Sequence, residues 1–152
     1  MFLKEYLKRF ENKKIKIFVD MDGVIVDYDF GMPCEYDIKR PLYASIKKLE
    51  EISKMNNVEL FIFSATRMNE GINQKNIWLD KYAPFFKKQN RIIISREEND
   101  FVSSANLKAN YLEKYQRDNS ILIVIDDDPR NLKEINKLNE DIILLKDTAL
   151  ID

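Results

Sequence analysis

Short apolar runs and amphipathic stretches alternate along most of the chain. Five runs rich in Ile, Val, Leu and Phe predict strands at 15–20, 58–63, 92–94, 121–125 and 142–145. Between them, apolar residues recur every three or four positions, which predicts helices at about 42–55, 72–82, 107–115 and 132–138. Strands that are apolar throughout are typical of a parallel sheet covered on both faces. Serial strand–helix–strand units therefore predict a three-layer, Rossmann-like α/β fold with a central, mostly parallel five-stranded sheet.

The first residues carry a further helical pattern. One helical face gathers the apolar side chains Phe2, Leu3, Tyr6, Leu7 and Phe10. We expect residues 1–13 to form an amphipathic helix packed on the core. No linker, internal repeat or low-complexity tract divides the chain, so a single domain over 1–152 is predicted. A chain of this length buries roughly two thirds of its unfolded surface, enough for a core.

The charge balance and the hydropathy limit the classes of partner. Lys and Arg total 25 against 26 Asp and Glu, a net charge of -1. This balance argues against a generally basic nucleic-acid-binding surface, although a small local basic pocket stays open. Residues 1–14 lack the apolar centre of a signal peptide, and no apolar run approaches the roughly 20 residues that span a membrane. We expect a cytoplasmic protein without a membrane partner.

Missing residue types narrow the chemistry further. The chain has no His, one Cys (Cys34) and three Gly. Ser-His-Asp and Cys-His catalytic units, His-ligated zinc and intramolecular disulfides are therefore excluded. The glycine-rich nucleotide-binding loops are absent as well. Carboxylates, hydroxyls, lysines and arginines remain to carry a reaction, with or without a metal that prefers oxygen ligands.

Polar segments follow four of the predicted strands, at 20–23, 64–67, 95–96 and 126–128. Ligands bind beyond the carboxyl ends of the strands in an open parallel sheet, so these segments are expected to meet. Two of them are crowded with carboxylates, namely Asp20 with Asp22, and Asp126–Asp128. Crowded carboxylates repel one another unless a cation lies among them. Because all the donors are hard oxygens, the pattern favours Mg²⁺.

A calcium-binding EF-hand loop is the other acidic alternative for the first cluster. Such a loop needs Gly at its sixth position and Glu at its twelfth. In a loop that begins at Asp20, these positions hold Ile25 and Gly31, so the alternative is excluded.

The polar segments resemble the motifs of one enzyme superfamily in order. Residues 18–25, Phe-Val-Asp-Met-Asp-Gly-Val-Ile, resemble the first motif of the haloacid dehalogenase-like (HAD) phosphohydrolases, hhhDxDGhh. Residues 61–64 resemble the second motif, Lys108 the third, and residues 123–127 the fourth. The resemblance covers about 15–145, and its specific parts are the first motif and the terminal acidic pair.

This resemblance implies a role for each matching residue. Asp20 would be the nucleophile that forms an aspartyl-phosphate intermediate. Asp22 would protonate the leaving-group oxygen and later deprotonate the attacking water, which favours hydrolysis over dehalogenation. Ser64 and Lys108 would bind the phosphoryl oxygens.

The resemblance also implies the ligands of Mg²⁺. They would be the Asp20 carboxylate, the Asp22 backbone carbonyl and Asp127, with Asp126 close by. The activity implied is that of a Mg²⁺-dependent phosphomonoesterase.

A narrower resemblance concerns the capless 5'(3')-deoxyribonucleotidases. It rests on Lys75 and Trp78, in a K-x-x-W helix, and on the strand that ends at Ser95-Arg96. The family pattern has a lysine after this strand and the present chain has none, so Lys108 or Lys75 would supply the phosphate-binding charge. Arg67, Lys75 and Arg96 are the candidate substrate-binding residues. We expect Trp78 to pack in the core.

The distances between motifs leave no room for a cap domain. About twenty residues separate Asp22 from the helix at 42, which allows a loop but no folded cap. The resemblance implies that such an open site serves macromolecular substrates, or small ones completed by another subunit. We expect the substrate to be a nucleotide or another small phosphorylated metabolite, with the loop 27–33 as a specificity element. Two alternatives stay open: a polynucleotide 3'-phosphatase that acts on nucleic-acid ends, and a receiver-type phospho-acceptor domain.

Overall fold

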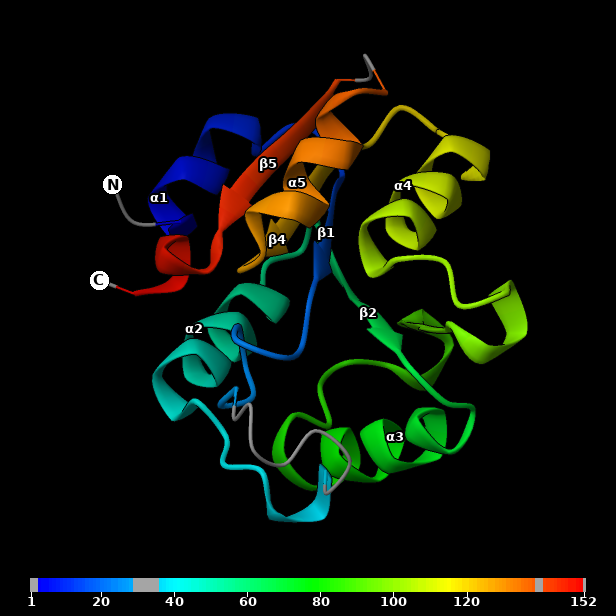
Figure 1. Ribbon diagram of the computed structural model, residues 1–152. Helices are drawn as coiled ribbons and strands as arrows, with labels where there is room; N and C mark the ends of the chain where they lie inside the picture. The colour runs from blue at the N-terminus through cyan, green and yellow to red at the C-terminus, as the bar shows by residue number, and fades with distance from the viewer. Residues whose placement is uncertain (1–2, 29–35, 139–140, 152) are drawn as a thin grey trace.

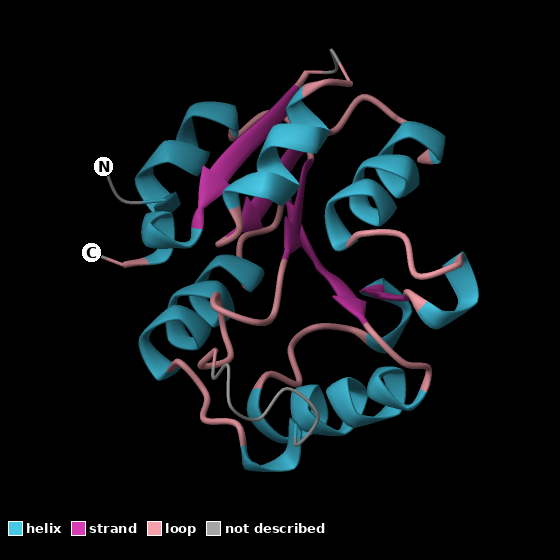
Figure 2. Ribbon diagram, in the orientation of Figure 1, coloured by secondary structure: helices cyan, strands magenta, loops and turns pink. Residues whose placement is uncertain are grey.

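A single parallel sheet forms the centre of the computed structural model, which describes residues 3–28, 36–138 and 141–151 (Figures 1 and 2). Its strands are β1 (Ile15–Val19), β2 (Val58–Thr66), β3 (Arg91–Ser95), β4 (Ile121–Asp126) and β5 (Ile142–Lys146). The strand order is β3-β2-β1-β4-β5, and every pairing is parallel. The predicted α/β fold with a five-stranded sheet is confirmed, and the sheet is wholly parallel.

Helices cover both faces of the sheet and complete the three layers (Figure 1). One face packs against α1 (Leu3–Leu7), α2 (Tyr43–Ser53) and α3 (Glu70–Tyr82), and the other against α4 (Ser104–Lys114) and α5 (Pro129–Asn136). Alternation along β1 explains the division, since Ile17 and Val19 face the first group whereas Phe18 faces the second. Short 3-10 turns lie at Lys8–Phe10, Tyr36–Ile38, Lys88–Asn90, Glu97–Asn99 and Asp147–Leu150.

The N-terminal helix is shorter than the predicted segment 1–13. Helix α1 ends at Leu7, and a 3-10 turn continues it to Phe10. Leu3 and Leu7 are buried in the core cluster that also contains α2 and α3. The amphipathic pattern thus marks residues that pack on the domain itself.

Strand β2 differs from its prediction in length. The apolar run ends at Phe63, but the strand continues to Thr66. The reason is the register, because β1 pairs with the first part of β2 whereas β3 pairs with residues 62–66. The edge strand supplies hydrogen bonds beyond the apolar run, so Ser64 lies inside a strand and not at its end.

The sheet topology places a crevice at the carboxyl end of β1. From β1 the chain moves to β2 and β3 on one side, and then crosses to β4 and β5 on the other. Ligands bind in α/β sheets at such a reversal of strand order. No large cap domain covers this edge among the described residues. In the same residues, no helix combines the length and the apolar character that crossing a membrane would need.

Candidate active site

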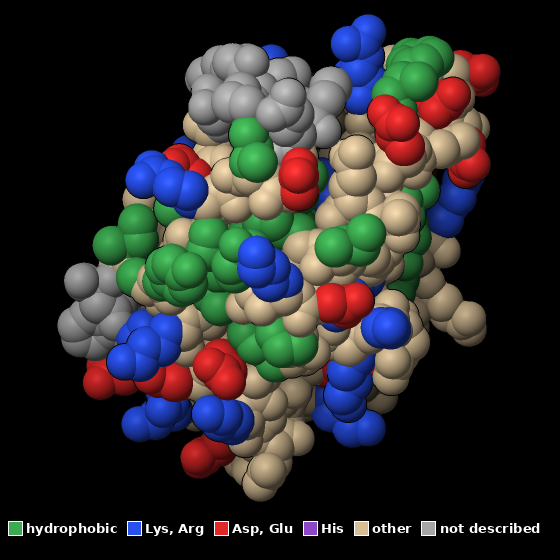
Figure 3. All heavy atoms as spheres, turned by 90° about the horizontal axis from the view of Figure 1, so that it is seen from below, with side chains coloured by type: hydrophobic (Ala, Val, Ile, Leu, Met, Phe, Trp, Pro, Cys, Tyr) green, Lys and Arg blue, Asp and Glu red, His purple; other side chains and the backbone are tan. Residues whose placement is uncertain are grey.

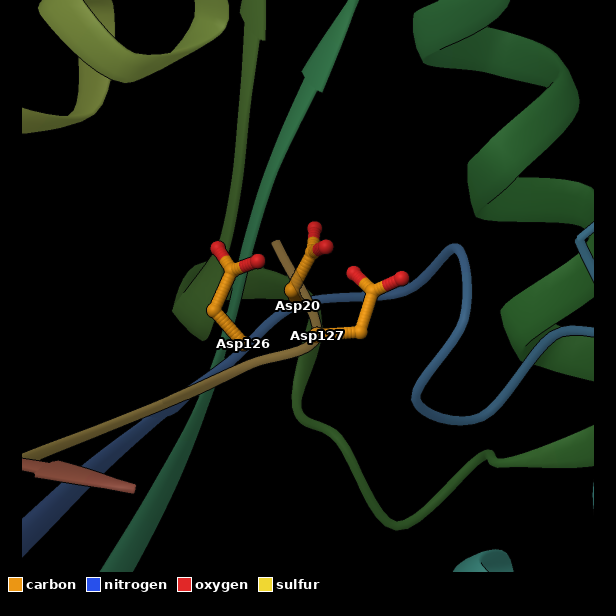
Figure 4. A group of neighbouring side chains, drawn as sticks. All are labelled: Asp20, Asp126 and Asp127. Carbon is orange, nitrogen blue, oxygen red and sulfur yellow. The ribbon is translucent and has the colours of Figure 1, made fainter. Parts of the chain in front are cut away.

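Three carboxylates meet at the crevice between β1 and β4. Asp20 follows β1 directly, Asp126 is the last residue of β4, and Asp127 comes next. Their side chains extend to the same side (Figure 4), and one oxygen of each lies within 4.8 Å of the others. The two strands hold this arrangement because Val19 pairs with Ile125, whose carbonyl accepts a hydrogen bond from the Asp20 backbone at 2.9 Å.

A buried lysine joins two of these carboxylates. The ammonium group of Lys108, on α4, lies 3.0 Å from Asp20 Oδ1 and 2.6 Å from Asp126 Oδ2. Only 1% of the Lys108 residue is exposed. Burial alone would lower the pKa of Lys108, but Asp20 and Asp126 outweigh it and raise this pKa. Lys108 is therefore held as a cation against the candidate nucleophile.

Hydrogen-bond donors occupy both oxygens of Asp126. Its Oδ1 accepts from the Asp128 backbone at 2.9 Å, and Asn131 Nδ2 donates to both oxygens. Lys108 adds a third donor group, and Asp126 is fully buried. This carboxylate is oriented by its neighbours, whereas Asp20 and Asp127 line the adjoining cavity.

The environment raises the pKa of the two carboxylates that face the cavity. Burial raises the pKa of Asp20 to about 7, an effect that Lys108 opposes and Asp126 reinforces. Burial also raises the pKa of Asp127 to about 6, with further contributions that include repulsion by Asp126. For Asp20, the nearby charge of Lys108 does not offset the effect of burial. A divalent cation among the three would add positive charge, so the side chains fit a metal ion that prefers oxygen ligands.

A second charged group surrounds Asp22. Lys39 and Tyr36 donate to Asp22 Oδ1 at 3.1 and 3.0 Å, and Lys75 donates to Oδ2 at 3.1 Å. Burial opposes ionisation of Asp22, but Lys75 and Lys39 together outweigh it and lower its pKa. Asp22 is thus an ionised carboxylate clamped between two lysines.

Lys75 connects Asp22 with Ser64. Besides Asp22, its ammonium group donates to Ser64 Oγ at 2.7 Å and to the Ala65 carbonyl at 2.9 Å. Three acceptors use the three protons of this group. Lys75 therefore positions Ser64 and Asp22, and the buried Ser64 hydroxyl keeps its own proton to donate.

The segment that carries Tyr36 and Lys39 is fixed by α3. Trp78 Nε1 donates to the Lys39 carbonyl at 3.1 Å, and the Trp78 ring meets the Tyr36 ring edge-on at 6.2 Å. Trp78 is 2% exposed, as expected for a core residue. Its polar edge also ties the two chain segments together.

Two adjoining cavities lead to these groups. The first, of about 630 Å³, is lined by Asp20, Asp22, Lys108 and Asp127, and the second, of about 310 Å³, by Lys39, Arg67, Lys75 and Arg96 among others. They share Asp22, Tyr28, Ala65 and Arg96. On the face seen from below, Figure 3 shows basic and acidic side chains interspersed around apolar ones.

The residues expected from sequence gather around these cavities. Asp20, Asp126, Asp127 and Lys108 form the acidic side, and Asp22, Ser64 and Lys75 form the side next to it. Arg67 is exposed at the second cavity, and Arg96 lies between the two with its guanidinium bonded to the carbonyls of Val102 and Phe101. In the expected loop 27–33, residues 29–33 lie outside the described residues.

Sequence reasoning missed three residues of the site. Asn131 could have been found, since it lies in the first turn of the helix after the fourth motif. No motif in the sequence marks Tyr36 and Lys39, because they lie 14 and 17 positions from Asp22 along the chain. Their roles depend on how the segment after β1 folds back onto α3.

Comparison with known proteins gives a likeness of fold. No protein-family model matches the chain, and no curated protein matches its sequence. Among solved structures, a chain in the Pnkp1/Rnl/Hen1 RNA repair complex is similar, with a TM-score of 0.66 and 16% sequence identity. The match covers 89% of the present chain but 43% of the other, so this chain spans less than half of its neighbour's length. The likeness therefore supports the α/β fold.

Proposed function

We propose that this protein is a Mg²⁺-dependent phosphomonoesterase that works through an aspartyl-phosphate on Asp20. The observation that carries the proposal is the place of Asp20, which pairs with the Lys108 ammonium, lies close to the carboxylates of Asp126 and Asp127, and lines a cavity. A carboxylate beside a fixed cation and a candidate metal site has the surroundings that an attack on phosphorus requires.

The metal would be held by Asp20 and Asp127, with Asp126 beside them and the Asp22 backbone carbonyl as a further ligand. When bound, Mg²⁺ would neutralise charge on the phosphoryl oxygens and on the ligating carboxylates. The raised pKa values of Asp20 and Asp127 support this assignment, since they mark carboxylates in need of positive charge.

The reaction proceeds in two displacements by the residues of this chain. An Asp20 oxygen attacks phosphorus, the bond to the leaving oxygen breaks, and Asp22 gives that oxygen a proton. Asp22 is ionised in the free protein, and the phosphate dianion beside it favours the uptake of this proton. Asp22 then takes a proton from water, which attacks phosphorus, releases phosphate and restores Asp20.

Cationic and hydroxyl groups around Asp20 bind the phosphoryl oxygens. Lys108 is held within 3.0 Å of Asp20 and would contact the transferred group directly. Ser64 would donate its hydroxyl proton, with Lys75 keeping it in place. Arg67 and Arg96 would contact other parts of the substrate, which we propose to be a nucleotide or another small phosphorylated metabolite.

The test compares Asp20→Asn with the unmodified protein in a Mg²⁺-dependent phosphatase screen. The screen covers nucleoside monophosphates, sugar phosphates and 3'-phosphorylated oligonucleotides. Asp118→Asn is the matched control, since Asp118 pairs with Lys16 outside both cavities. We expect Asp20→Asn to keep its fold and lose at least about 10³-fold in turnover, whereas Asp118→Asn keeps its activity. Retained turnover in Asp20→Asn would refute the proposal.

Processing of nucleic-acid ends is the second candidate function. The observation in its favour is the likeness of fold to a chain in an RNA repair complex. In the same screen, release of phosphate from oligonucleotide 3' ends, but not from mononucleotides, would select it. A receiver-type domain is disfavoured, because the flavodoxin-like order 2-1-3-4-5 differs from the observed β3-β2-β1-β4-β5.

A further inference from the structure

The second cavity has an excess of positively charged side chains that the proposed reaction at Asp20 does not require. Four cationic side chains line it, namely Lys39, Arg67, Lys75 and Arg96, against two carboxylates, Asp22 and Glu70. The leaving group of a simple phosphate ester carries no charge that would match this excess. The cavity adjoins the one that holds Asp20 and shares Asp22 with it, so it lies where a leaving group would extend.

Two of these cations are buried and share one counter-charge. The side chains of Lys39 and Lys75 are each 4% exposed, and both are paired with Asp22. Within the described residues, Asp22 is the one ion-pair partner of both, so two ammonium charges stand against one directly paired carboxylate. Placing such charges away from water is costly, and the cost is recovered when an anion binds beside them.

The donor capacity of the two lysines differs. Lys75 spends its three protons on Asp22, Ser64 and the Ala65 carbonyl. Among the residues that the structure describes, Lys39 makes one hydrogen bond, to Asp22 Oδ1, and its ammonium group lies over the Tyr36 ring at 4.6 Å. Since an ammonium group has three donors, Lys39 can reach a further acceptor within the cavity.

Arg67 provides a second available cation at the rim. Its side chain is exposed, lines the cavity and makes no ion pair with any residue in the part of the chain that the structure describes. Arg96 stands beside it, with its guanidinium held by the carbonyls of Val102 and Phe101. An anion entering the cavity would thus meet Arg67 and Arg96 outside and Lys39 inside.

We propose that the second cavity is a subsite for a second phosphate, carried on the leaving group of the substrate and bound by Lys39, Arg67 and Arg96. The inference rests on the proposed function and narrows its substrate to phosphomonoesters that bear another phosphate. A nucleoside bisphosphate and a 3'-phosphorylated nucleic-acid end both present this chemistry. The second phosphate is bound and not transferred, so the bonds made and broken at Asp20 stay the same.

The experiment compares kcat/KM for matched substrates in Mg²⁺. Thymidine 3',5'-bisphosphate carries the second phosphate, and thymidine 3'-monophosphate and 5'-monophosphate lack it. A 3'-phosphorylated dinucleotide offers a phosphodiester in its place and distinguishes a nucleic-acid end from a small metabolite. We expect the substrates with a second phosphate to be preferred by about tenfold or more, the effect of one hydrogen bond to a charged group.

Variants at Lys39 test the assignment of the subsite. Lys39→Met should bring the preference close to one, and Lys39→Arg should restore most of it. Lys47→Met is the matched control, because Lys47 is exposed on α2 and lines neither cavity. It should keep the preference of the unmodified protein. Lys39→Met also removes a hydrogen bond to Asp22. This loss affects substrates with and without a second phosphate alike, so it cancels in the ratio of their kcat/KM values.

The outcomes separate this inference from the proposed function. Equal kcat/KM for all the substrates, or an unchanged preference in Lys39→Met, would overturn the subsite and leave the phosphatase in place. If no substrate is turned over, the proposed function fails, and titration calorimetry of the same ligands still tests the subsite. The bisphosphate must then bind at least about tenfold more tightly than either monophosphate, and Lys39→Met must remove the difference.

Discussion

Gly23 lies directly against the side chain of Asp127. A Cβ atom at Gly23 would overlap the Asp127 carboxylate, and the Gly23 φ of 80° is in the region that side chains disfavour. The turn after Asp22 therefore needs glycine for two reasons, its backbone conformation and the space it leaves. The turn that follows β1 and an acidic residue that follows β4 meet through this contact.

Gly23→Ala should destabilise the protein and also weaken its stabilisation by Mg²⁺. We expect a loss of about 1–2 kcal/mol in the free energy of unfolding from the positive φ, together with displacement of the Asp127 carboxylate. Mg²⁺ should then raise the melting temperature much less than in the unmodified protein, as measured by circular dichroism. Ile52→Val, a core truncation of similar cost, should keep the full response to Mg²⁺. An unchanged response in Gly23→Ala would contradict the assignment of Asp127 to the metal.

The response to Mg²⁺ should grow with pH. The pKa of Asp20 is raised to about 7 and that of Asp127 to about 6, so the folded protein holds protons that the unfolded chain has already lost. Without metal, the free energy of unfolding should fall as the pH rises from the ordinary aspartate range through about 7. Mg²⁺ must displace these protons when it binds. The increase in the protein's melting temperature on adding Mg²⁺ should therefore be larger at about pH 8 than at about pH 5. Equal gains at the two pH values would count against a site made of these carboxylates.

Lys108→Met should destabilise the protein strongly. Removal of the ammonium group leaves the buried carboxylate of Asp126 beside Asp20 without their shared cation. Breaking a buried ion pair costs about 3–5 kcal/mol, measurable by urea unfolding. Adding Asp126→Asn to this variant removes the unpaired charge and should recover part of the loss. A cost below about 1 kcal/mol for Lys108→Met alone would show that the bridge is not structural.

Trp78→Phe should loosen the segment that carries Lys39. The change removes the hydrogen bond from the indole to the Lys39 carbonyl, which should cost about 1 kcal/mol in urea unfolding. The preference for substrates with a second phosphate should also decrease, because Lys39 is no longer fixed beside Asp22. Tyr82→Phe, one turn further along α3, is the control and should change neither quantity. An unaltered preference in Trp78→Phe would separate the subsite from this hydrogen bond.

The strands and the acidic trio were accessible from local patterns. The apolar runs mark five strands, and each acidic segment follows one of them, so Asp20 and Asp126 had to meet at the same edge of the sheet. The apolar run predicts that Ser64 follows the end of the strand, at the same edge of the sheet. In the structure Ser64 lies within the strand, because pairing with β3 extends β2 to Thr66. A register between two strands is a long-range property that no apolar run reports.

The sequence by itself determined the order of strands and helices along the chain, the clustered acids and the absence of histidine. These features depend on residue type and on spacing within short segments. The tertiary structure decided that Lys108 bridges Asp20 and Asp126, and that Lys39 and Tyr36 hold Asp22 from a segment beyond the first motif. Such contacts arise where distant segments are packed and desolvated together, and the charge balance of the second cavity exists only there.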